Sequence, residues 1–158
     1  MVVVARRRRF VVAALLLLIA ACGGEAREGG GEGPPSREEW ISSAEAICAQ
    51  ADEEVRDLGT PQTLDELAVA ARETTAIVRG ELRELRELGS PPGDEAAVEG
   101  IVDALNQVGG AMARVADAAA AGDEAAVQEA GAEFEALNDR AGELARDYGL
   151  SECLGDEG

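Results

Sequence analysis

Apolar residues recur at alternating steps of three and four along four stretches between residues 36 and 149. This spacing puts apolar side chains on one face of an α-helix, whereas a half-buried strand would show alternation with a period of two, which no stretch displays. Short connections separate the four stretches, which are similar in length. The pattern predicts an all-α fold, an antiparallel up-down-up-down four-helix bundle.

Signals for helix ends flank the first two stretches. Ser36 and Thr63 are each followed by a glutamate three residues later, which is the arrangement of a capping box. Helices that begin there are expected to stop at Gly59 and Gly89, because glycine readily adopts the left-handed conformation that ends a helix.

The third and fourth stretches are bounded in the same way. The third follows the proline-containing break at 90–93, and Asp94 is expected to cap it. Asp123 is expected to cap the fourth, which Gly149 would end. Gly109 and Gly110 interrupt the middle of the third helix. They indicate close helix approach, a local kink, or a ligand cleft that would make the protein a small-molecule carrier.

The N-terminus has the pattern of a secretory signal, with Arg6–Arg9 as its basic part, Phe10–Ile19 as its apolar part, and small residues after them. The apolar run is shorter than the roughly 20 residues of a spanning helix. Ile19–Cys22 resembles the bacterial lipobox, in which the cysteine receives a diacylglyceryl group and cleavage falls just before it. An ordinary signal peptide or an uncleaved membrane anchor is the alternative.

These features divide the chain into three parts. Residues 1–21 are the expected signal peptide, and residues 22–35 are the expected lipidated Cys22 with a flexible Gly/Pro tether, which has no large apolar side chain. Residues 36–158 are the expected four-helix domain with a C-terminal tail.

Two cysteines remain if Cys22 is lipidated, and export to an oxidising compartment favours a disulfide between them. An antiparallel bundle brings the end of the fourth helix beside the start of the first. Cys153 is therefore expected to reach Cys48. Two free buried thiols are the alternative.

The order of these features resembles small uncharacterised helical lipoproteins of actinobacteria. The resemblance rests on the lipobox, the tether, Trp40 and Cys48 on the first helix, Ser90–Pro92 between helices, and Tyr148–Cys153 at the end. It implies a cell-envelope lipoprotein, anchored in the cell membrane by acyl chains on Cys22 and facing the extracytoplasmic side. It implies no established activity.

Charge and composition restrict the chemistry. The chain has 32 acidic and 14 basic residues, a net charge of −18, and no histidine. Such a strongly acidic protein is not expected to bind nucleic acid. The missing histidine removes Ser-His-Asp and Cys-His catalysis and the usual zinc and di-iron sites, so we expect no cofactor and no metal.

Four arginines share one stripe of the second helix, here called the arginine stripe: Arg72, Arg79, Arg83 and Arg86. They suit an anionic ligand, such as a cell-wall polymer or a phosphate group. Alternatively they pair with acids on this and neighbouring helices, including Glu81, Glu84 and Glu87.

Four acids follow one another at steps of four on the fourth helix: Glu135, Asp139, Glu143 and Asp147. Hard cations prefer converging oxygens, usually including loop carbonyls, so a solvated helix face is the favoured interpretation. The leading functional hypothesis is a membrane-tethered, non-catalytic binding module for an envelope protein or glycan. A small-molecule carrier and a carboxylate-based cell-wall enzyme are the alternatives.

Overall fold

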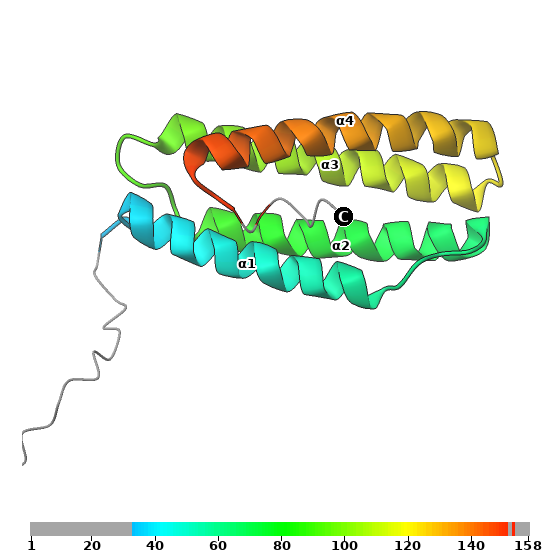
Figure 1. The fold of residues 1–158 in the computed structure, drawn as a ribbon, viewed down its shortest axis with the longest axis horizontal. Coiled ribbons are helices and arrows are strands. Elements are labelled where there is room, and N and C mark those ends of the chain that lie inside the picture. Colours follow the sequence, from blue (N-terminus) through cyan, green and yellow to red (C-terminus); the bar gives the residue numbers. More distant parts are fainter. Residues whose placement is uncertain (1–32, 152, 154–158) are drawn as a thin grey trace, which may run out of the picture. The chain divides into compact units, whose positions relative to one another are not determined.

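The computed structural model describes residues 33–151 and 153, and all its regular elements there are helices (Figure 1). They are α1 (Arg37–Asp57), α2 (Leu64–Glu87), α3 (Glu95–Ala120) and α4 (Glu124–Tyr148). The predicted all-α four-helix fold is confirmed. The expected signal peptide, the tether as far as residue 32, and Cys22 lie outside the described residues.

Three of the expected helix starts are confirmed by side-chain caps. Ser36 and Glu39 form the full capping box of α1, with the Ser36 hydroxyl accepting from the Glu39 amide and the Glu39 carboxylate accepting from the Ser36 amide. Thr63 accepts from the third amide of α2, and Asp123 accepts from the Ala126 amide of α4. Each cap satisfies a backbone donor that a helix N-terminus leaves open.

Asp94 occupies the N-cap position of α3 but makes no capping hydrogen bond, which corrects the expected side-chain role. Its carboxylate instead accepts a hydrogen bond from the Tyr148 hydroxyl at 3.0 Å and lies 3.8 Å from the Arg37 guanidinium. The start of α3 is therefore tied to the end of α4 and the start of α1.

Consecutive helices pack side by side, and the contact between α1 and α2 is much less extensive than the two that follow. Among the described residues, α1 and α4 have no Cα atoms within 8 Å of each other. The C-terminal segment compensates at one end of the bundle. Leu150, only 2 % exposed, follows α4 into the core. The rings of Trp40 and Tyr148 meet edge to face, with their centroids 5.3 Å apart.

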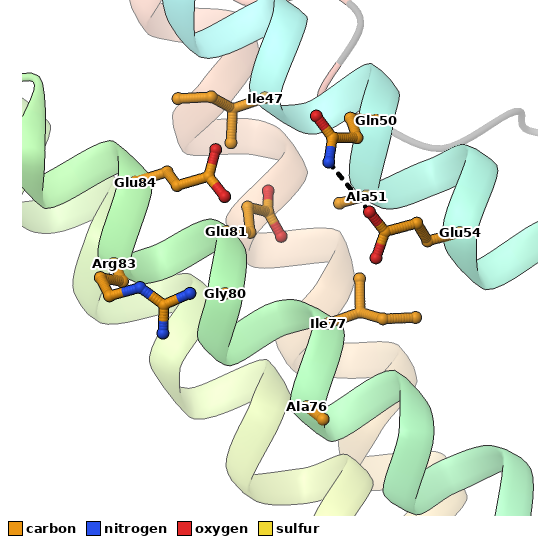
Figure 2. Close-up of a pocket in the computed structure, with 10 residues that line it drawn as sticks. All are labelled: Ile47, Gln50, Ala51, Glu54, Ala76, Ile77, Gly80, Glu81, Arg83 and Glu84. Atoms are coloured by element: carbon orange, nitrogen blue, oxygen red, sulfur yellow. Dashed lines mark hydrogen bonds between the residues drawn. The ribbon is translucent and has the colours of Figure 1, made fainter.

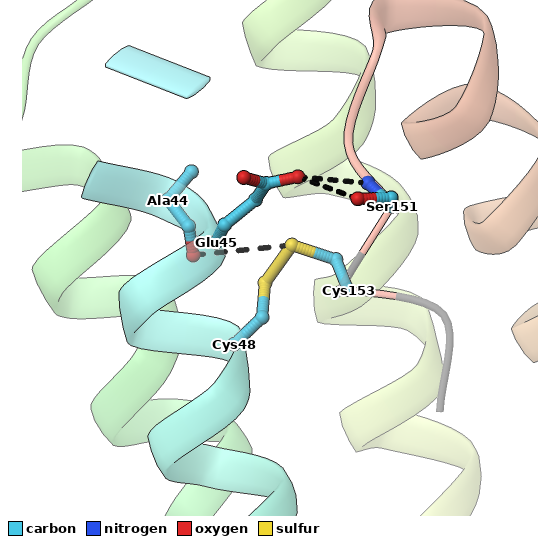
Figure 3. Close-up of a disulfide and its surroundings, with 5 residues drawn as sticks. All are labelled: Ala44, Glu45, Cys48, Ser151 and Cys153. Atoms are coloured by element: carbon cyan, nitrogen blue, oxygen red, sulfur yellow. Dashed lines mark hydrogen bonds between the residues drawn. A yellow bond between two sulfur atoms is a disulfide. The ribbon is translucent and has the colours of Figure 1, made fainter. Parts of the chain in front are cut away.

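The predicted disulfide is confirmed (Figure 3). It joins Cys48 of α1 to Cys153, two residues separated by 105 positions in sequence and 4.9 Å between Cα atoms. Beside it, the amide and hydroxyl of Ser151 both donate to the Glu45 carboxylate. Covalent and polar links to the C-terminal segment thus fix the first half of α1.

The core is unevenly distributed along α1. The main cluster of buried residues includes Trp40 and Ala44 from α1, together with residues of α2, α3, α4 and Leu150. Two smaller clusters draw only on α2, α3 and α4. Ala51 and Val55, on the expected apolar face of α1, are only partly buried and belong to none of the three clusters. Among the described residues, the second half of α1 therefore contributes least to the buried core.

Within the described part of the chain, no helix is sufficiently long and apolar to traverse a lipid bilayer.

Candidate functional site

All four residues of the arginine stripe are exposed on α2. Arg72 and Arg79 line a groove of about 360 Å³ between α2 and α3. Arg86 lines a second groove of about 250 Å³ beside α3, and Arg83 lies at the edge of the groove between α2 and α1. The stripe therefore forms the outer ridge of α2, with a groove on either side.

The stripe has no ion-pair partner among the described residues. Arg37 pairs with Asp94, and Arg114 pairs with Glu133 at 2.7 Å, but neither pair involves α2. The suggested pairing of the stripe with Glu81 and neighbouring acids is not seen. The four guanidinium groups keep their donors available to a ligand that brings acceptor oxygens.

Glu81 lies in a different environment from the one suggested by its sequence neighbours. It lines a groove of about 340 Å³ between α1 and α2, here called the acidic groove: Ile47, Gln50, Ala51, Glu54, Ala76, Ile77, Gly80, Glu81, Arg83 and Glu84. Figure 2 shows the carboxyl groups of Glu81 and Glu54 in the space between the two helices, with the Arg83 guanidinium on the side of α2 away from α1.

The surroundings of Glu81 oppose its ionisation. Burial between the helices, and secondarily the negative charge of Asp52, raise the pKa of Glu81 from 4.5 to about 7. Glu81 forms no hydrogen bond or ion pair with any described residue. Sequence reasoning missed this role, although a signal was present. Glu81 lies three positions after Val78 and four before Leu85, at the edge of the apolar face of α2.

The pKa of Tyr148 is also shifted. Burial first, and then its hydrogen bond and proximity to Asp94, raise the pKa of Tyr148 to about 12, and the Arg37 guanidinium opposes the shift. Arg37 stacks over the ring at 4.3 Å and donates to the Tyr148 carbonyl oxygen. Tyr148 therefore stays protonated near neutral pH and links three helices.

Gly109 is a packing position. A Cβ atom there would lie 3.2 Å from Cγ1 of Val78, because α2 and α3 approach closely at this point. Of the interpretations left open for the glycine pair, close helix approach agrees with this contact.

The four acids Glu135, Asp139, Glu143 and Asp147 are all exposed on α4, as a solvated face requires. Among residues 33–151 and 153, no group of three or more acidic, cysteine or histidine side chains is arranged to hold a metal ion.

In comparisons with known proteins, the chain matches no family model, no curated protein and no solved structure.

Proposed function

We propose that this protein is a lipid-anchored, extracytoplasmic and non-catalytic binding module, which holds an anionic envelope glycan or polymer along the arginine stripe of α2. The lipobox at Cys22 supports the anchor, and the disulfide between Cys48 and Cys153 is consistent with an oxidising compartment. The observation that carries the binding proposal is the exposure of four guanidinium groups without carboxylate partners.

The shape of the stripe favours an extended ligand. Arg72 and Arg86 are fourteen residues apart, which corresponds to about 21 Å along a helix. The net charge of −18 repels anions at long range, so affinity must come from close contacts with several guanidinium groups at once. A polymer with regularly spaced phosphate or carboxylate groups meets that requirement better than a single small anion.

A binding measurement with a defined polyanion tests the stripe. The processed protein in detergent micelles would be titrated calorimetrically with an inorganic polyphosphate chain of about ten units, long enough to span it. Arg79→Gln/Arg83→Gln is expected to weaken binding at least tenfold. The matched control is Arg140→Gln/Arg146→Gln, which removes the same charge from exposed positions of α4 and is expected to change affinity less than twofold.

Equal losses in the two double variants would show that binding reflects overall charge and would reject the stripe as a site. Absence of binding by the unmodified protein would reject it as well.

The anchor is tested separately by the intact mass of the protein isolated from its native membrane. A chain that begins at Cys22 and carries acyl groups is expected. An unprocessed or unacylated chain would contradict the proposed location.

A further inference from the structure

The two grooves between α2 and α3 share one arrangement of charge. Arg72 and Arg79 line the groove of about 360 Å³ from α2, and Asp117 lines it from α3. Arg86 lines the groove of about 250 Å³ from α2, and Asp103 lines it from α3. Arginines therefore lie on the α2 side of both grooves and carboxylates on the α3 side. These five residues are here called the charged seam.

Both grooves open on the same side of the helix pair. The three arginines of the charged seam are seven residues apart, and its two aspartates are fourteen apart, so each set occupies one helix face. Gly110 lies midway between the two aspartates. A Cβ atom there would lie 3.8 Å from a guanidinium nitrogen of Arg114, at the end of a flexible side chain. An extended ligand can therefore pass over the α3 backbone from one groove to the other.

The opposite charges of the seam do not neutralise each other by direct contact. All five side chains are exposed, and none of them forms an ion pair with any described residue. Packed helices have axes about 8–10 Å apart, and screening at 0.1 M salt acts over about 10 Å. An anion bound to the arginines is therefore repelled by the aspartates across the groove, unless the ligand also carries positive charge.

We propose that the charged seam binds a zwitterionic envelope polymer, whose units carry both an acidic group and a free amine. The guanidinium groups of α2 would donate to the acidic groups, and the amines would donate to Asp103 and Asp117. A purely anionic chain satisfies only the α2 side, so the two aspartates select against it. This inference rests on the proposed binding function of the arginine stripe and narrows the class of its ligand.

Two synthetic probes that differ only in charge test the ligand class. Each is an oligo(glycerol phosphate) of about six units, long enough to span the roughly 21 Å between Arg72 and Arg86. One probe carries a 2-aminoethyl ether on every unit, and in the other every amine is acetylated. Both would be titrated calorimetrically into the processed protein in micelles near neutral pH. We expect the amine probe to bind at least tenfold more tightly than the acetylated probe.

Two double variants separate the seam from the overall charge of the protein, because a net charge of −18 attracts any amine. Asp103→Asn/Asp117→Asn keeps the size of both side chains and should reduce the preference for the amine probe to less than threefold. The matched control is Asp139→Asn/Asp147→Asn, which removes the same charge from exposed positions of α4. It should keep a preference of at least tenfold.

Three results would overturn the inference: equal affinity of the unmodified protein for the two probes, a preference that persists in Asp103→Asn/Asp117→Asn, or an equal loss of preference in the control. The arginine stripe itself would survive any of these results if Arg79→Gln/Arg83→Gln still weakened binding of both probes. Absence of binding of either probe would reject the stripe as well. If the double aspartate variant does not fold, Asp117→Asn replaces it, and an unchanged preference in that variant would reject the inference.

Discussion

Replacing Cys48 and Cys153 together by alanine is expected to destabilise the folded domain by up to about 4.7 kcal/mol. The disulfide closes a loop across 105 positions, and the chain-entropy model assigns about that value to a loop of roughly 100 residues. Domains of this size have unfolding free energies of about 5–15 kcal/mol, so the bond supplies a large share of the total.

The loss should be concentrated on α1. The described parts of α1 and α4 have no close backbone contact, and the disulfide joins α1 to the segment after α4. Without the bond, α2, α3 and α4 keep the two clusters that contain no α1 residue. Trp40, the single tryptophan, is fully buried in the cluster that α1 helps to form, and its fluorescence therefore reports the detachment of α1.

Urea unfolding followed by two probes measures both effects. In the oxidised protein, tryptophan fluorescence and far-ultraviolet circular dichroism should give coincident transitions. In the double-alanine variant, the fluorescence transition should come first, at lower urea. Ser151→Ala, which removes a hydroxyl hydrogen bond to Glu45 but keeps the disulfide, is the control and should cost less than about 1.5 kcal/mol.

A loss below about 1 kcal/mol in the double variant would refute the entropic argument for so long a loop. A large loss with coincident transitions would agree with the entropic argument but would refute the expectation that the loss is concentrated on α1.

Four further substitutions test the packing, each by its effect on the free energy of unfolding in urea. Gly131→Ala should stabilise the folded domain by about 0.5–1 kcal/mol, because no neighbouring group lies within 4 Å of the new Cβ. Gly109→Ala should stabilise it less, or destabilise it, because the new Cβ would lie 3.2 Å from the Val78 side chain. Trp40→Phe should lower the free energy of unfolding by less than the 3–5 kcal/mol typical of Trp→Ala. The indole N–H of Trp40 is buried without an acceptor, so its removal offsets part of the packing loss. Tyr148→Phe should cost about 1 kcal/mol by removing the hydrogen bond to Asp94, and no loss would show that this bond is not important for stability.

The sequence by itself determined the local structure of the described region. The boundaries near Ser36, Thr63 and Gly149 follow from capping and from the left-handed preference of glycine, which depend on a few neighbouring residues. The all-α fold followed from the three-four periodicity of apolar positions. The pairing of Cys48 with Cys153 was predictable because only two cysteines remained once Cys22 was set aside.

Tertiary structure alone decided which polar groups lose water and which keep it. Glu81 and Glu84 are three residues apart on α2, yet Glu84 is exposed, whereas burial against α1 and the charge of Asp52 raise the pKa of Glu81. The arginine stripe was visible in the sequence, but its lack of ion-pair partners depends on distances to neighbouring side chains.

The uneven attachment of α1 also required the structure. Periodicity marks an apolar face along the whole helix, including Ala51 and Val55, but burial depends on how closely another helix approaches that face. The backbone of α4 does not come close to α1, and in the first half of α1 Leu150 and Cys153 supply contacts instead. Helical periodicity is set by backbone geometry over a few residues, whereas desolvation depends on contacts between residues far apart in sequence.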